Sequence, residues 1–153
     1  MAVSSRISPC LWFDGRALEA ASFYVSIFDN SRVLTVSQLT AGPAIGNQFV
    51  EFELGGDKFT AIDGGPSFTF SPAISFVVMC DSQDEIDYFW DTLAEEGKPG
   101  RCGWLEDKFG VSWQIVPAVL SELMSRAPAK VMEAILSMQK LDIAHLRKAA
   151  GLR

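Results

Sequence analysis

The stretch AISFVVMCDSQDEIDYFWDTL, residues 73–93, leads from an apolar strand through Asp81 into apolar residues at helical spacing. Residues 11–28, LWFDGRALEAASFYVSIF, follow the same order around Asp14. A strand, an aspartate and a helix that recur in this order indicate an internal duplication. The two copies therefore predict a chain built from two related modules.

The first copy predicts a β-α-β-β-β module over residues 6–63. A strand from Ile7 to Phe13 is followed by a helix that reaches Asn30, because apolar residues recur there every three or four positions. Glycine- and proline-rich segments then divide the chain into short apolar runs. These runs predict three more strands, at residues 31–39, 48–54 and 58–63.

The second copy predicts a shorter module over residues 73–117. Its helix ends at Gly97, and residues 101–107 and 111–116 are strand-like. The segment between Gly97 and Arg101 is too short for a full strand, so this module is abbreviated. For the last hairpin we expect a two-residue loop at Lys108 and Phe109, which pairs Trp104 with Trp113 on the core face and Gly103 with Gln114.

Residues 118–153 have the character of helices. An apolar stripe covers residues 119–124, Pro128 is a favourable first residue of a second helix, and Asp142 is a plausible N-cap of a third. We expect their Met and Leu stripes to pack against the sheet or a second subunit. The predicted class is α+β: one domain, residues 1–153, with two βαβββ modules and a C-terminal helical extension.

Composition excludes several classes of function. The chain has 153 residues, 48% of them hydrophobic, and a net charge of -6 with pI near 4.7, which argues against a nucleic-acid partner. No apolar run suits a signal peptide or a membrane span, so we expect a cytoplasmic protein. The three cysteines are expected to be reduced, each a small buried hydrophobe. With His145 as the single histidine, a His-based metal site or a Ser-His-Asp triad lacks its residues.

Five segments carry a resemblance to a known family. They are LWFDGRALEAASFYVSIF, FVEFELGGDKFTAIDGGPSFTF, AISFVVMCDSQDEIDYFWDTL, CGWLEDKFGVSWQIVP and VMEAILSMQKLDIAHL. The chain resembles the PhnB-like, 3-demethylubiquinone methyltransferase-like branch of the vicinal oxygen chelate superfamily, to which glyoxalase and bleomycin-resistance proteins belong. The resemblance implies two curved modules that form an open cup of mixed sheet, completed in a homodimer.

The resemblance also implies four positions for a divalent metal ion on the floor of the sheet. Two lie about seven residues before the aspartate that ends the first strand of each module: Ile7, and Ile74, or Ser75 if the register slips by one. The third is Gln114, and the fourth lies around residues 60–62, next to Asp63. Isoleucine cannot bind a metal and a neutral amide is a weak ligand, so we expect no metal and no cofactor.

The family label names methyl transfer, for which a Rossmann-type enzyme would carry a glycine-rich loop after its first strand. Here that loop is DGRALEA, with one glycine, and the parallel β-α alternation is missing. Methyl transfer is therefore not the leading hypothesis, and it is kept as the alternative that the family label suggests.

Three residues are candidates for contact with a ligand: Gln114, Glu51 and Ser75. In residues 48–54, alternation sends Val50, Phe52 and Leu54 to the core, so Glu51 and Glu53 lie on the other face. These carboxylates either bind a cationic or hydroxylated ligand, act as acid or base, or simply face water.

The leading hypothesis is a metal-independent homodimer that binds an unknown small organic molecule. An enzyme is the alternative, either a methyltransferase or a lyase or isomerase with Glu51, Glu53 or Asp63 as base. A third hypothesis is sequestration of a basic drug in an acidic dimer groove.

Overall fold

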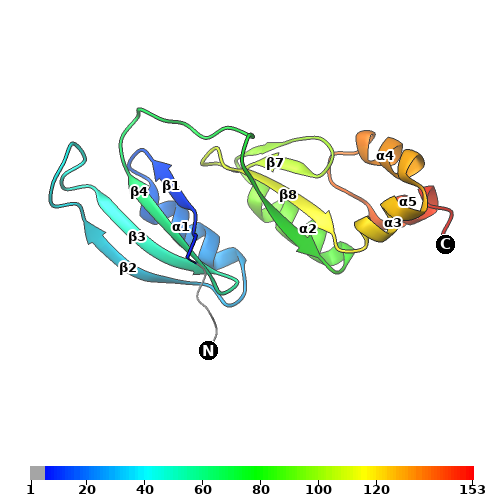
Figure 1. The fold of residues 1–153 in the computed structure, drawn as a ribbon, viewed down its shortest axis with the longest axis horizontal. Coiled ribbons are helices and arrows are strands. Elements are labelled where there is room, and N and C mark those ends of the chain that lie inside the picture. Colours follow the sequence, from blue (N-terminus) through cyan, green and yellow to red (C-terminus); the bar gives the residue numbers. More distant parts are fainter. Residues whose placement is uncertain (1–5) are drawn as a thin grey trace. The chain divides into compact units, whose positions relative to one another are not determined.

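The computed structural model describes residues 6–153, which divide after Thr69 into two compact units (Figure 1). The boundary falls between the two predicted modules. The first unit contains one four-stranded sheet, the first sheet, with strand order β1-β4-β3-β2, in which β1 and β4 are parallel and the other neighbours antiparallel. Its elements are β1 (Cys10–Phe13), α1 (Ala17–Ile27), β2 (Arg32–Gln38), β3 (Gln48–Leu54) and β4 (Asp57–Asp63).

The second unit repeats this topology in a second sheet, with order β5-β8-β7-β6 and β5 parallel to β8. The predicted duplication, and with it the α+β class of two βαβββ modules, is confirmed. The abbreviated part of the second module is β6, which has two residues. The elements of this module are β5 (Ser75–Cys80), α2 (Gln83–Ala94), β6 (Lys98–Pro99), β7 (Trp104–Glu106) and β8 (Ser112–Pro117).

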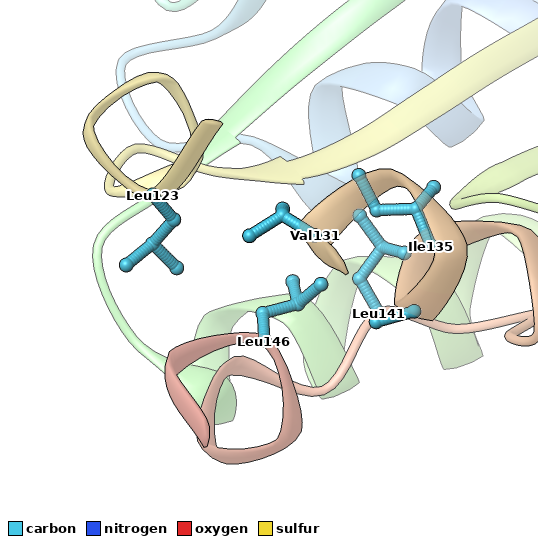
Figure 2. Packing of buried hydrophobic residues seen from close by; sticks show 6 residues of the cluster. Leu123, Val131, Ile135, Leu141 and Leu146 are labelled. Carbon is cyan, nitrogen blue, oxygen red and sulfur yellow. The ribbon is translucent and has the colours of Figure 1, made fainter. Parts of the chain in front are cut away.

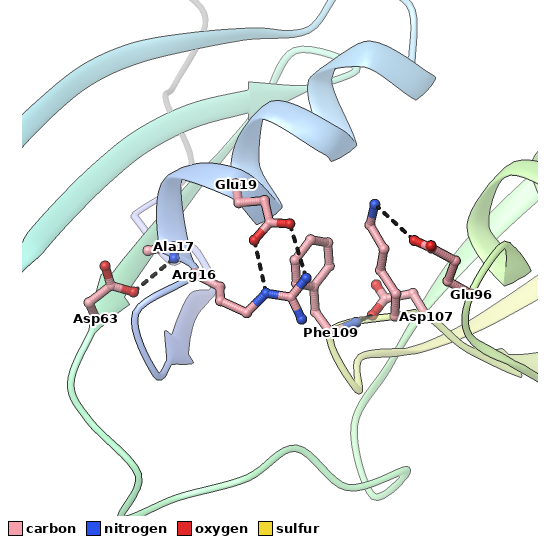
Figure 3. Close-up of polar contacts among 8 residues, drawn as sticks. Arg16, Ala17, Glu19, Asp63, Glu96, Asp107 and Phe109 are labelled. Carbon is pink, nitrogen blue, oxygen red and sulfur yellow. Dashed lines mark hydrogen bonds and ion pairs between the residues drawn. The ribbon is translucent and has the colours of Figure 1, made fainter.

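A buried aspartate holds the start of α1. The side chain of Arg16, at the N-cap, forms an ion pair with Glu19 and does not cap the helix. Asp63, only 5% exposed at the end of β4, accepts a hydrogen bond from the Ala17 N–H at 2.8 Å (Figure 3). Its negative charge also suits the positive end of the helix dipole.

The core of the first unit follows the predicted alternation. Val50, Phe52 and Leu54 are buried, and the buried stripe of α1 includes Ala20 and Tyr24. Tyr24 stacks on Phe52 with ring centroids 6.5 Å apart. This burial leaves Glu51 and Glu53 on the opposite face, as predicted.

The predicted register of the last hairpin is wrong by one position. Trp104 pairs with Gln114, and Trp113 pairs with Leu105. The reason is Asp107, which is 3% exposed and holds a longer connection. One carboxylate oxygen accepts bonds from the N–H groups of Phe109 and Val111 at 2.8 and 3.0 Å, and the other accepts the indole N–H of Trp113 at 2.8 Å. Trp113 is therefore drawn into the core, and Trp104 lies on the other face of the sheet.

Three helices follow Pro117, as predicted: α3 (Leu120–Arg126), α4 (Pro128–Leu136) and α5 (Ile143–Ala149). They enclose a small core of their own, drawn in Figure 2, that contains Leu123, Val131, Ile135, Leu141 and Leu146. No helix within residues 6–153 is both long and apolar enough to cross a membrane.

Side-chain and backbone contacts fix this extension to the second module. The Gln83 amide donates to the Leu141 carbonyl at 3.1 Å and accepts from the Ile143 N–H at 2.8 Å. Lys140 forms an ion pair with Asp87 at 3.0 Å. The N–H groups of residues 102 and 103 donate to the carbonyls of residues 138 and 139 at 2.9 and 2.8 Å.

Glycine is needed at position 103. Its φ is +81°, and a Cβ there would lie 3.0 Å from the Ile115 carbonyl oxygen and 3.0 Å from Leu141. A side chain at this position would therefore strain the backbone and force Leu141 or the Ile115 carbonyl to shift.

Substitution Asp107→Asn is expected to lower the free energy of unfolding by about 1–3 kcal/mol, because the amide N–H₂ cannot accept a bond from either the Trp113 indole or a backbone N–H. Urea unfolding with an unchanged m value measures the loss. Asp14→Asn, at an exposed turn aspartate, is the control and should change stability by less than about 0.5 kcal/mol. Equal effects of the two substitutions would contradict the role of Asp107.

Candidate functional site

The second sheet has one face packed on helix α2 and one open face. Phe76, Cys80, Trp113 and Ile115 belong to the packed side, where α2 contributes Ile86 and Leu93. Paired strand residues lie on the same face, so the register defines the other side. This open face of the second sheet consists of Ser75, Val77 and Met79 of β5, Ser112, Gln114 and Val116 of β8, and Trp104 and Glu106 of β7.

The structure brings Gln114 and Ser75 together on this face. The Gln114 Nε2 donates a hydrogen bond to the Ser75 Oγ at 2.9 Å, and both side chains are partly buried. Ile74, the other residue considered in this register, precedes β5 and is 76% exposed. Ser75 is thus the residue of the pair that belongs to the sheet.

The donor set at this place does not fit a divalent metal. A hydroxyl and a neutral amide, already bonded to each other, supply no anionic ligand and no imidazole. Across residues 6–153, no three side chains of His, Cys, Asp or Glu gather closely enough to hold an ion. Asp63, the carboxylate near the expected fourth position, is occupied at the start of α1.

Glu51 lies in the first unit, on the open face of the first sheet. Its carboxylate accepts a hydrogen bond from the Thr35 hydroxyl at 2.9 Å and pairs with the Lys58 ammonium at 3.2 Å. The Thr35 bond first, and then Lys58, hold the pKa of Glu51 below its usual value. Glu53 pairs with Arg32 at 3.4 Å. A carboxylate held in its charged form in this way is a weaker base, so the geometry does not favour acid–base catalysis at Glu51.

Trp104 is a residue of the open face that sequence reasoning missed. The assumed loop length assigned it to the core, whereas the observed register places it directly across from Gln114. No local signal in CGWLEDKFGVSWQ distinguishes the two registers, because each of them places a tryptophan on the core face of the hairpin. The discriminating residue is Asp107, whose burial the sequence did not reveal.

The three cysteines differ in environment. Cys80 is buried, and desolvation, with smaller effects of Glu85 and Asp81, raises its pKa to about 11, so it is an inert packing residue. Cys102 is partly buried, but Cys10 is exposed on the open face of the first sheet. The expectation of a buried thiol is therefore wrong for Cys10, because β1 has an open side there.

Comparison with known families agrees with this architecture. A family model described as 3-demethylubiquinone-9 3-methyltransferase matches residues 5–116. The chain belongs to this family. Among curated proteins, none matches its sequence.

Solved structures support the assignment. The structure named "Putative 3-demethylubiquinone-9 3-methyltransferase, PhnB protein, from Bacillus cereus" is 38% identical, covers 74% of this chain and 100% of its own, and has a TM-score of 0.66. Protein PA1353 from Pseudomonas aeruginosa is 22% identical over 74% of this chain and 98% of its own, with a TM-score of 0.63.

The fosfomycin resistance protein FosX from Listeria monocytogenes, in complex with Mn(II) and sulfate, is 14% identical over 78% of this chain and 97% of its own, with a TM-score of 0.53. At this identity the likeness concerns the fold alone. PhnB, at 38% identity, belongs to the vicinal oxygen chelate superfamily, so the resemblance seen in the sequence is confirmed for this member of the 3-demethylubiquinone-9 3-methyltransferase family.

The part of this family member beyond residue 116 carries a separate groove of about 860 Å³ between α4 and α5. None of the three candidate residues lies in it. Its charged lining side chains are exposed, so we do not assign it a ligand. The lining residues are Lys130, Glu133, Ala134, Ser137, Asp142, Ala144, His145, Lys148 and Ala149.

Substitution Thr35→Val is expected to raise the pKa of Glu51 toward its usual value, because it removes the largest cause of the lowering. The contacts of a carboxylate with a lowered pKa stabilise the fold above the usual pKa and are lost as pH falls through the lowered one. An NMR titration of the side-chain carboxyl carbon measures the shift. Thr60→Val, at the position that pairs with Glu51 on β4, is the control, since the Thr60 hydroxyl donates to the Pro9 carbonyl. An unchanged Glu51 pKa in Thr35→Val would show that the hydroxyl is not the cause.

Proposed function

We propose that the open face of the second sheet binds a small organic molecule without the help of a metal ion. The observation that carries this proposal is the hydrogen bond between Gln114 and Ser75, at positions where the superfamily resemblance places metal ligands. After this bond, the Gln114 amide still has its oxygen and one N–H, and Ser75 still has its hydroxyl proton.

The surroundings of this pair suit a ligand. Val77 and Met79 are 52% and 58% exposed, and Val116 lies beside them on β8. A few polar groups with fixed positions among apolar side chains are typical of small-molecule sites. The polar groups would orient the ligand, and the apolar side chains would supply most of the buried area.

Methyl transfer is the second candidate, and the name of the matched family is the observation that favours it. The start of α1, where a nucleotide-binding enzyme would hold an anionic group, is filled by the Asp63 carboxylate. The start of α2 is closed by Ser82, which accepts from the Glu85 N–H at 3.2 Å. Calorimetric titration with S-adenosylmethionine separates the two candidates, since measurable binding would favour the methyltransferase.

We also propose a homodimer in a reducing compartment such as the cytoplasm. On α4, Met132 and Leu136 are 43% and 58% exposed and, four residues apart, lie on one side of the helix, which supports a contact with a second copy. The reducing compartment is supported by the cysteines, because Cys10, Cys80 and Cys102 are all free thiols. The mass of one chain is 16.7 kDa, and analytical ultracentrifugation should give twice this mass. Met132→Lys should shift the protein toward the monomer, and a wild-type monomer at all concentrations would refute the dimer.

Metal analysis of the purified protein is expected to give far less than one ion of zinc, nickel, iron or manganese per chain. In an NMR screen of neutral organic fragments, binders are expected to shift the Gln114 side-chain amide signals. Gln114→Ala should weaken these binders about fivefold, the effect of one lost hydrogen bond.

Gln38→Ala, at an exposed glutamine of β2, is the matched control and should leave the affinities unchanged. One tightly held metal ion per chain would overturn the metal-independent function. A screen without any binder at the open face of the second sheet would overturn small-molecule binding there.

A further inference from the structure

We propose that the ligand of this face is a flat, uncharged heteroaromatic ring whose edge carries a hydrogen-bond donor next to an acceptor. Trp104 stacks on the ring, and Gln114 bonds its edge. This inference rests on the proposed function, because it names the class of molecule for the same face.

Trp104 differs from the other three tryptophans. The indole N–H of Trp12 donates to the Gly65 carbonyl at 2.9 Å, and its ring meets Phe68 edge-on at 5.0 Å. Trp113 donates to Asp107, and Trp90 is only 7% exposed. Within residues 6–153, Trp104 is the partly exposed tryptophan whose indole N–H donates no hydrogen bond and whose ring contacts no other aromatic ring. A partly exposed aromatic ring beside polar groups is a suitable partner for a stacked ring.

The register brings this indole next to the Gln114 amide. The neighbouring pair, Gly103 and Ile115, shares a backbone hydrogen bond, from the Ile115 N–H to the Gly103 carbonyl at 2.8 Å. Trp104 and Gln114 therefore form a pair without backbone hydrogen bonds, the arrangement in which opposite side chains come closest, with Cα atoms about 4.5 Å apart. A ring on the indole would have its edge within reach of the amide.

The chemistry of the amide selects the edge of the ring. Ser75 occupies one N–H of Gln114, so one N–H and the amide oxygen remain on the same group. A glutamine that offers a donor and an acceptor together bonds an acceptor and a donor that lie side by side on the edge of a heterocycle, as it does with N7 and the N6 amino group of adenine. A lactam, with N–H next to C=O, presents the complementary pair.

Charge on the face selects an uncharged ring. The row of paired residues that contains Val77, Gln114 and Trp104 has no ionisable side chain. The charged residues Glu106 and Lys98 lie one row away, at opposite positions in the register of β7 and β6. A net charge on the ring would find no partner in its own row.

Three probes separate the ring from its edge. 2-Quinolinone has a flat ring and a lactam edge, 2-methoxyquinoline keeps the ring without the donor, and 2-piperidone keeps the lactam without the aromatic ring. We expect 2-quinolinone to bind about tenfold more tightly than either of the others, the discrimination that one bidentate contact provides. Its titration should shift the indole N–H of Trp104 and the side-chain amide of Gln114 in NMR spectra.

Variants assign the two contacts. Gln114→Leu should bring the two quinoline probes to equal affinity, and Trp104→Leu should weaken both about tenfold. Trp104→Phe should keep most of the binding, which a purely structural role of the indole would not predict. Tyr88→Leu, at a 47% exposed aromatic residue of α2, is the control and should change neither affinity.

Equal affinities of the three probes for the wild-type protein would overturn this inference. It would also fail if 2-quinolinone left the Trp104 signal unmoved. Binding of other neutral fragments at the same face would then leave the proposed function standing, whereas a face that binds no fragment of any class would remove both.

Discussion

The carboxylate of Asp107 is the constraint on which the second module depends. In a nearly water-free position it accepts hydrogen bonds from two N–H groups of its own loop and from the Trp113 indole. Three donors around one carboxylate satisfy most of its acceptor capacity, so its burial does not leave an uncompensated charge. The same bonds set the length of the loop, and the length of the loop decides which tryptophan enters the core. The open face beside Gln114 is therefore a consequence of a side chain that lies inside the protein.

The two duplicated modules hold the first turn of their helices with different side chains. In the first unit Asp63 ends β4 and holds the first turn of α1, whereas the residue that ends β8 is Pro117. The second helix instead begins with Ser82 at its N-cap, and Glu85 accepts a bond from the Asp81 N–H at 2.7 Å. The two modules thus keep the order of their elements while satisfying the start of the helix by different side chains. Duplication preserved topology here, and local chemistry diverged.

Much of the architecture follows from the spacing of apolar residues. Alternation in β3 gave the correct face for Val50 and Glu51, and the helical stripes located α1 and α2. Ser75 and Gln114 were also named from the sequence, because they stand at positions where the superfamily resemblance implies metal ligands. The register of the last hairpin could not be obtained in this way, since a one-residue change in the loop exchanges the faces of all residues on a strand. Trp104 was missed for that reason alone, and the exposure of Cys10 depends likewise on an open sheet face that periodicity does not report.

The C-terminal extension lies outside the part of the chain that matches the family, yet it completes the backbone of that part. The carbonyls of residues 138 and 139 accept the N–H groups of residues 102 and 103, immediately before the strand that carries Trp104. A relative without such a tail must leave these two donors to water or supply other acceptors. The segment is therefore not an independent appendage that can be exchanged freely between relatives. Its sequence and that of the loop before β7 are expected to have changed together, so that a chimera with a foreign tail would need the matching loop as well.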